Sequence, residues 1–269
     1  MMPNIEPVAA TPSPGGEVPV GHVGVVEAVW RYPVKSMAGE PLETVSVGPR
    51  GLAGDRRWAV YSGDGRLGSG KEGRRLRRMD PLFTLAAQTS AASGLGALVT
   101  VEMPDGEYLV VGEPSTDQAL SRLLGEPVSL RAEGACPGSP LGPSAPPVPH
   151  HDAGAVSLVG TATLVALGVL LHGPPVDPRA LRANLVVETR SPYAEETWTG
   201  RELAIGGVRL RVIRRTERCR MVDLDQVRLP GRRGLLKAVG NHRDLCVGMY
   251  ADVLAPGELA VGDPVTLRG

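Results

Sequence analysis

The feature that most constrains this fold is a long series of short apolar segments, each ending at a turn rich in glycine or proline. The chain has 35 Gly and 25 Pro, and only 3% of its residues are aromatic, so its core must consist mainly of Val, Leu and Ala. No internal repeat relates the segments. The pattern predicts strands at Val23–Val29, Glu43–Val47, Trp58–Tyr61, Leu82–Gln88, Leu98–Met103, Tyr108–Val111, Val128–Ala132, Ala155–Val159, Asn184–Val187, Arg201–Ile205, Val208–Ile213, Val247–Leu254 and Val265–Leu267.

Few helices are expected among these strands. Helices are predicted at Ser115–Leu124, where Gly125 is the stop signal, at residues 162–172, and over the short segment Leu235–Val239. The fold class is therefore mostly β (α+β), with an antiparallel β-barrel core, flanking helices and two interlocked halves.

The composition along the chain predicts four regions. Residues 1–20 are rich in Pro, Gly and small side chains, and we expect them to be disordered. Residues 21–133 form the first half, and residues 150–269 form the second. Between them, residues 134–149 are a Pro/Gly-rich loop that cannot pack a core, and that serves either as a connector or as a flap over a pocket.

One uncharged run, Ala155–Leu171, could be either a membrane-spanning segment or part of the core. It is at the short end for a membrane span and is interrupted by Ser, Thr and Gly. We therefore predict a buried strand followed by an amphipathic helix capped by Thr161. The N-terminus has no signal-peptide pattern, so we expect a cytoplasmic protein with no membrane partner.

Charge limits the kinds of partner. The formal net charge is +0, which argues against general nucleic-acid binding. The dense cluster Arg74–Arg78 is either a solvated face or an anion site, since the arginine fork matches phosphate oxygens.

The chain has three cysteines, Cys136, Cys219 and Cys246. This odd number without paired spacing argues against a disulfide framework or a structural zinc site. Cys246 lies in an apolar strand and is expected to be a small core residue, whereas Cys136 lies in the Pro/Gly-rich loop.

Cys219 has a chemical context that the other two lack. Four arginines near it would favour the thiolate, the form that attacks electrophiles and binds soft metals: Arg214, Arg215, Arg218 and Arg220.

A second cluster, His150-His151-Asp152, suggests a metal site. We discount it because adjacent residues of an extended chain point to opposite faces, so two neighbouring histidines rarely ligate one ion.

The order of several short motifs resembles that of the MOSC family, the domains related to the C-terminal part of molybdenum cofactor sulfurase. The similarity covers about Val23 to Leu267 and includes the type with an N-terminal barrel half, to which amidoxime-reducing components belong. The segments that carry it are Trp30–Ser36, Arg50–Trp58, Leu181–Val187, Pro192–Trp198, Thr216–Asp225 and Pro256–Val265.

The resemblance implies that residues 21–133 are an N-terminal MOSC barrel half and residues 150–269 a MOSC domain. It further implies a molybdenum cofactor of the molybdopterin type between them, with Cys219 as the catalytic residue and metal ligand. The residues that fall on the family's cofactor-binding positions are Lys35, Ser36, Arg56, Arg182, Asn184 and Arg218.

Three departures from the family pattern lie near these positions. Gly160 stands where the family often has Ser or Thr, Ala183 replaces a proline, and the segment Val222–Gln226 differs from the common sequence after the cysteine. These departures leave substrate preference and cofactor loading open.

The leading hypothesis is a molybdenum-dependent oxidoreductase that reduces small N-hydroxylated molecules. The sequence has no flavin, haem or iron–sulfur motif, so a separate electron-donor protein is expected. The alternatives are a sulfur transferase that carries a persulfide on Cys219, and a non-catalytic module that binds or delivers the cofactor.

Overall fold

The computed structural model describes residues 21–90, 98–134, 150–151 and 153–268. The predicted disordered terminus, nearly all of the Pro/Gly-rich loop, Cys136 and Asp152 lie outside the described residues.

Seven strands form a closed barrel, because the first strand of the chain pairs back to the strand at the other end of the sheet. Val208, Leu210 and Val212 point into the barrel while Arg209 and Arg211 are exposed, as the two-residue period of a strand requires. In the order of the sheet the strands are β13 (Leu185–Val187), β12 (Val156–Gly160), β16 (Cys246–Ala255), β15 (Val208–Glu217), β14 (Glu202–Ile205), β18 (Pro264–Arg268) and β1 (Gly21–Arg31).

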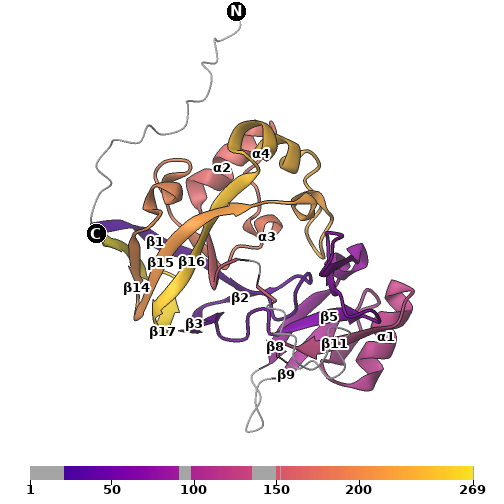
Figure 1. Cartoon of the computed structure of the whole chain (residues 1–269). Coiled ribbons are helices and arrows are strands. Elements are labelled where there is room, and N and C mark those ends of the chain that lie inside the picture. Colours follow the sequence, from indigo (N-terminus) through magenta and orange to yellow (C-terminus); the bar gives the residue numbers. More distant parts are fainter. Residues whose placement is uncertain (1–20, 91–97, 135–149, 152, 269) are drawn as a thin grey trace, which may run out of the picture.

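The two halves of the chain interlock through β1. This strand belongs to the N-terminal half, yet it lies between β18 and β13 of the C-terminal half (Figure 1). A short strand, β2 (Glu40–Leu42), extends the sheet beyond β1, and a small sheet beside the barrel consists of β17 (Gly257–Ala260), β3 (Thr44–Gly48) and β4 (Gly51–Leu52). The predicted barrel with interlocked halves is confirmed.

A second core belongs to the N-terminal half alone. Buried Val60, Leu85, Val101 and Leu120 form its centre, where helix α1 (Pro114–Leu124) packs against the strands. Gly125 ends this helix in the left-handed conformation (φ 71°), as its sequence predicts. One sheet contains β11 (Val128–Ala132), β5 (Trp58–Ser62), β6 (Leu67–Ser69) and β7 (Leu76–Arg78), and the other contains β10 (Tyr108–Val110), β9 (Leu98–Glu102) and β8 (Ala86–Ser90).

The remaining helices flank the barrel, and α2 (Thr161–Leu170) and α4 (Leu235–Arg243) lie together at one end of it (Figure 1). Shorter helical segments are α3 (Pro178–Leu181) and the 3₁₀ turns η1 (Asp80–Thr84), η2 (Ala194–Trp198) and η3 (Arg220–Asp223). Among the residues described, none of the helices has the length and apolar character that a membrane crossing needs.

One strand prediction needs correction. Leu82–Gln88 is not one strand, because Pro81 opens the 3₁₀ turn η1 and the strand β8 begins only at Ala86. The barrel is mostly antiparallel, as expected, although β12–β13 pair in parallel, as do β6–β7 outside the barrel.

The uncharged run also differs from its prediction. Its strand, β12, is completely buried, but α2 is not amphipathic, because Val165 and Val169 are exposed on its outer side. The cap is Gly160 rather than Thr161. In the C-terminal part, α4 continues to Arg243, and Cys246 is half-buried at the start of β16 rather than in the core.

Candidate functional site

The site begins where β1 ends, at the buried ring of Tyr32. The backbone N–H of Tyr32 donates to Asp55 Oδ1 (2.7 Å), and its hydroxyl donates to the carbonyl of Ala183 (3.3 Å). Burial raises the pKa of Tyr32 to about 12, so the ring is neutral at physiological pH. The guanidinium carbons of Arg56 and Arg182 lie 5.0 and 4.3 Å from its centroid. One aromatic ring thus brings together two cations that are far apart in sequence.

Three of the predicted cofactor-binding residues have left-handed backbones. Ser36, Arg56 and Arg182 have φ angles of 71°, 47° and 53°, a region that residues other than glycine seldom occupy. Such conformations cost on the order of 1–3 kcal/mol each and persist only where the surroundings hold them. Hydrogen bonds do so here, since Arg56 N–H donates to the Tyr32 carbonyl (2.7 Å) and Arg182 N–H to the Arg179 carbonyl (3.0 Å).

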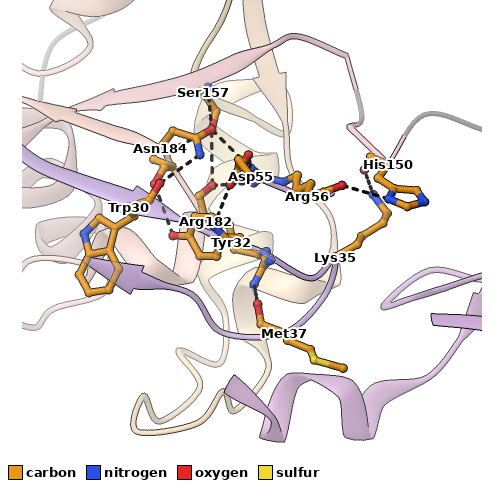
Figure 2. A network of polar contacts seen from close by, with 11 residues as sticks. Trp30, Tyr32, Lys35, Met37, Asp55, Arg56, His150, Ser157, Arg182 and Asn184 are labelled. Atoms are coloured by element: carbon orange, nitrogen blue, oxygen red, sulfur yellow. Dashed lines mark hydrogen bonds and ion pairs between the residues drawn. The ribbon is translucent and has the colours of Figure 1, made fainter. Parts of the chain in front are cut away.

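Asn184 organises the floor of the site. Its Oδ1 accepts from the backbone N–H and the hydroxyl of Ser157 (3.1 and 2.9 Å) and from Arg56 Nη1 (3.4 Å). Its Nδ2 donates to the carbonyl of Trp30 at 3.1 Å (Figure 2). The amide therefore ties β1 to β12, and its hydrogen bonds face the protein.

The remaining N-terminal residues of the site are also fixed by main-chain oxygens. The Lys35 ammonium donates to the carbonyl of His150 (2.8 Å), and the Ser36 hydroxyl donates to the carbonyl of Gly68 (3.1 Å). Both side chains belong to residues that are at least nine-tenths buried.

Cys219 follows β15 and is half-buried. The preceding Arg218 donates from Nε and Nη2 to the carbonyl of Val247 (2.9 and 2.6 Å) and from Nη1 to that of Leu181 (2.6 Å). Its guanidinium thus joins the end of β15 to β16 and α3. Arg218 fixes the chain that presents the cysteine.

The other arginines near Cys219 have carboxylate partners or lie outward. Arg220 pairs with Asp80 (2.6 Å), and Arg215 pairs with Glu196 and Asp244 (both 3.4 Å). Arg214 is exposed on β15. Arg215 and Arg220 therefore join neighbouring segments as well as adding positive charge near the thiol.

All seven predicted site residues line one cavity. The space between its walls is about 840 Å³, a figure that includes open solvent at its mouth. The residues that meet there are Lys35, Ser36, Arg56, Arg182, Asn184, Arg218 and Cys219. Lys35, Arg56 and Arg182 thus meet at one cavity although they are far apart in sequence, whereas what these residues bind stays a prediction.

The cavity includes polar residues that the sequence did not mark as site residues. Lys71 adds a cation from the N-terminal half, and Ser157, Thr216, Glu217 and Tyr250 line the wall on the C-terminal side. Thr216 could have been predicted from the sequence, because residues two apart in an extended chain share a face and Arg218 was already a candidate site residue. Lys71 and Tyr250 reach the cavity only through the tertiary fold.

The structure also shows where the two histidines and the arginine cluster Arg74–Arg78 lie. His150 is completely buried, and His151 lines the cavity. In the arginine cluster, Arg77 pairs with Glu126 (3.2 Å) and Arg78 with Asp80 (2.7 Å), so it is largely a surface with ion pairs.

Steric crowding explains why glycine occupies position 160, where the family often has Ser or Thr. A Cβ there would lie 2.6 Å from Thr189 Oγ1 and 2.7 Å from Glu195 Oε2. The Glu195 carboxylate accepts from Gly160 N–H (3.1 Å) and from the Thr163 hydroxyl (2.9 Å). The Thr189 hydroxyl accepts from Ala162 N–H (3.2 Å) and so takes the place of a serine or threonine cap at α2. Burial raises the pKa of Glu195.

Comparisons with known proteins agree with this architecture. The sequence pattern of the MOSC N-terminal beta barrel domain matches residues 23–131, and that of the MOSC domain matches residues 146–266. Mitochondrial amidoxime reducing component 2 of Bos taurus is 25% identical, covering 94% of this chain and 85% of its own. Mitochondrial amidoxime-reducing component 1 of Homo sapiens is also 25% identical, covering 92% of this chain and 84% of its own.

A further relative is the molybdenum cofactor sulfurase of Danio rerio, which is 25% identical over 72% of this chain but only 27% of its own length. The two matching patterns follow each other along the chain and together span nearly all of it. The chain belongs to the MOSC family, in the type that carries an N-terminal MOSC barrel domain.

Proposed function

We propose that this protein binds a molybdenum cofactor and reduces N-hydroxylated small molecules with electrons from a separate donor protein. The observation that carries the proposal is the cavity itself, where one cysteine and six predicted cofactor-binding residues from both halves meet. The relatives named amidoxime reducing components support the choice of substrate class.

The chemistry of the cavity fits such a cofactor. Cys219 offers a soft sulfur ligand for the metal. Lys35, Arg56 and Arg182 offer positive charge for the phosphate. Thr216 Oγ1 is buried on the wall and has no hydrogen-bond partner among the described residues, so a polar group of a ligand can satisfy it.

When bound, the cofactor supplies a metal that exchanges electron pairs with a substrate. In the net reaction an N-hydroxyl group, two electrons and two protons give an N–H group and water. The chain's own contribution is to hold the Cys219 sulfur at the cavity wall, to bind the phosphate, and to keep the site partly closed to solvent. The donor protein and the expected cytoplasmic location stay predictions, which co-purification and cell fractionation test.

The decisive experiment compares three proteins made in a host that synthesises the cofactor: wild type, Cys219→Ser and Cys246→Ala. Each is analysed for folding, for molybdenum per chain, and for reduction of a hydroxylamine or amidoxime by a chemical reductant. Wild type and Cys246→Ala are expected to hold molybdenum and turn over. Cys219→Ser is expected to fold but to lose activity by at least about 100-fold, since a hydroxyl is a poor replacement for a thiolate.

Full molybdenum content and full turnover in Cys219→Ser would contradict the assignment. A wild type that never holds molybdenum, but releases sulfur from a persulfide on Cys219, would be a sulfur transferase instead. Bound molybdenum without turnover in the wild type would leave a cofactor-binding module.

A further inference from the structure

His150 stands out among the buried groups because nothing assigned to the site so far uses its imidazole. The residue is 0% exposed. Its Nδ1 lies 3.0 Å from the carbonyl oxygen of Arg56, and its Nε2 lies 3.0 Å from the hydroxyl of Tyr61 on β5. Figure 2 shows the His150 ring next to the Arg56 main chain and the end of the Lys35 side chain.

These partners determine the tautomer. A carbonyl oxygen only accepts, so Nδ1 must carry the proton and donate to Arg56. Nε2 is then the acceptor for the Tyr61 hydroxyl. The neutral imidazole is satisfied on both sides, and burial lowers the pKa of His150 to about 4, with the Lys35 charge acting in the same direction.

The same residue also holds a second cavity cation. The carbonyl oxygen of His150 accepts from the Lys35 ammonium at 2.8 Å. The imidazole therefore anchors the carbonyl that receives Lys35, and it also binds the carbonyl of Arg56, whose backbone is left-handed (φ 47°). Lys35 and Arg56 come from the N-terminal half, while His150 stands at the start of the C-terminal half.

We propose that His150 is a positioning residue that sets the affinity of the cavity for a phosphate-bearing ligand. It does so by clamping Arg56 and Lys35, through the Nδ1–H bond to Arg56 and through its own carbonyl to Lys35. The proposal rests on the proposed function only for the identity of the ligand. The clamp itself rests on the hydrogen bonds and on the burial of the ring.

Two substitutions separate the two ring nitrogens. In His150→Asn the side-chain amide can occupy the place of Nδ1 and keep the bond to Arg56 while losing Tyr61. In His150→Gln the amide reaches the place of Nε2 and keeps the bond to Tyr61 while losing Arg56. Tyr61→Phe removes the hydroxyl alone, and His172→Asn is the control, because His172 is exposed and asparagine tolerates its left-handed backbone.

The probe is inorganic phosphate, titrated against each purified protein by calorimetry. We expect phosphate to bind about tenfold more weakly to His150→Gln, because the loss of the hydrogen bond to Arg56 costs about 1 kcal/mol. For His150→Asn, Tyr61→Phe and His172→Asn, which keep that bond, we expect a change in affinity within about threefold. A second readout is the rate at which an acylating reagent modifies Lys35, followed by mass spectrometry. Only His150→Gln is expected to raise that rate.

Equal phosphate affinity and equal Lys35 acylation in folded His150→Gln and wild type would overturn the proposal. A tenfold loss in folded His150→Asn or Tyr61→Phe would also overturn it, and this arm stays decisive even if His150→Gln does not fold. Molybdenum content is measured in parallel. Absent molybdenum in the wild type counts against the proposed function, whereas the phosphate and acylation results still decide the role of His150.

Discussion

Several residues that the family motif marks for cofactor binding direct their polar atoms at the protein. All three nitrogens of the Arg218 guanidinium donate to main-chain carbonyls, and the Ser36 hydroxyl donates to the Gly68 carbonyl. Such bonds fix where a segment lies more than they bind a ligand. At this scale, a motif residue can therefore matter for the site by shaping its wall.

The pH dependence of stability tests the buried imidazole of His150. Its pKa is about 4 in the folded protein against an ordinary 6.5, so the unfolded chain binds more protons between these values. Stability is complete above pH 6.5 and falls as the pH drops toward 4, by up to about 3 kcal/mol for this residue. Urea unfolding of His150→Asn from pH 7.5 to 4.5 should show a flatter decline than wild type.

The control for that measurement is His172→Asn, which should keep the wild-type slope because His172 is exposed. His151, whose pKa burial also lowers to about 4, should account for part of the slope that remains. An identical slope in His150→Asn and wild type would show that His150 does not titrate abnormally.

At the scale of elements, the side chain of Asn184 links the barrel strands to the cavity. Asn184 precedes β13 and bonds to Ser157 on β12 and to Trp30 on β1. Three strands from distant parts of the sequence thus meet at one buried amide. The sequence marked Asn184 for the cofactor, and the structure gives it a structural task as well.

We expect Asn184→Ala to destabilise the fold by about 3 kcal/mol, because it leaves buried donors and an acceptor without partners. Urea unfolding with an unchanged m-value measures the loss. Asn241→Ala is the matched control, since Asn241 is exposed on α4 and its replacement should change stability by less than about 0.5 kcal/mol. A decrease of less than about 1 kcal/mol in the free energy of unfolding of Asn184→Ala would contradict this structural role.

At the scale of the whole molecule, the sequence was sufficient for the barrel class and for the motif residues, and insufficient for how they meet. Period-two alternation predicted strands such as Val208–Ile213 because it reflects a local property of the chain. Barrel closure pairs Val26 with Val187, and no local pattern encodes a contact across that distance. His150 escaped prediction for the same reason, since its partners come from residues 56 and 61.

Loading the cavity should stabilise both cores together. Lys35 and Arg56 belong to the N-terminal half, and Arg182 and Cys219 belong to the C-terminal half, so a ligand that contacts all four binds only when both halves are folded. At a ligand concentration of 100 times Kd, the stabilisation is about 2.7 kcal/mol. Calorimetric scans of the loaded and cofactor-free protein should show every unfolding transition shifted upward by loading. A shift confined to one transition, with the other unmoved, would place the binding site in a single half.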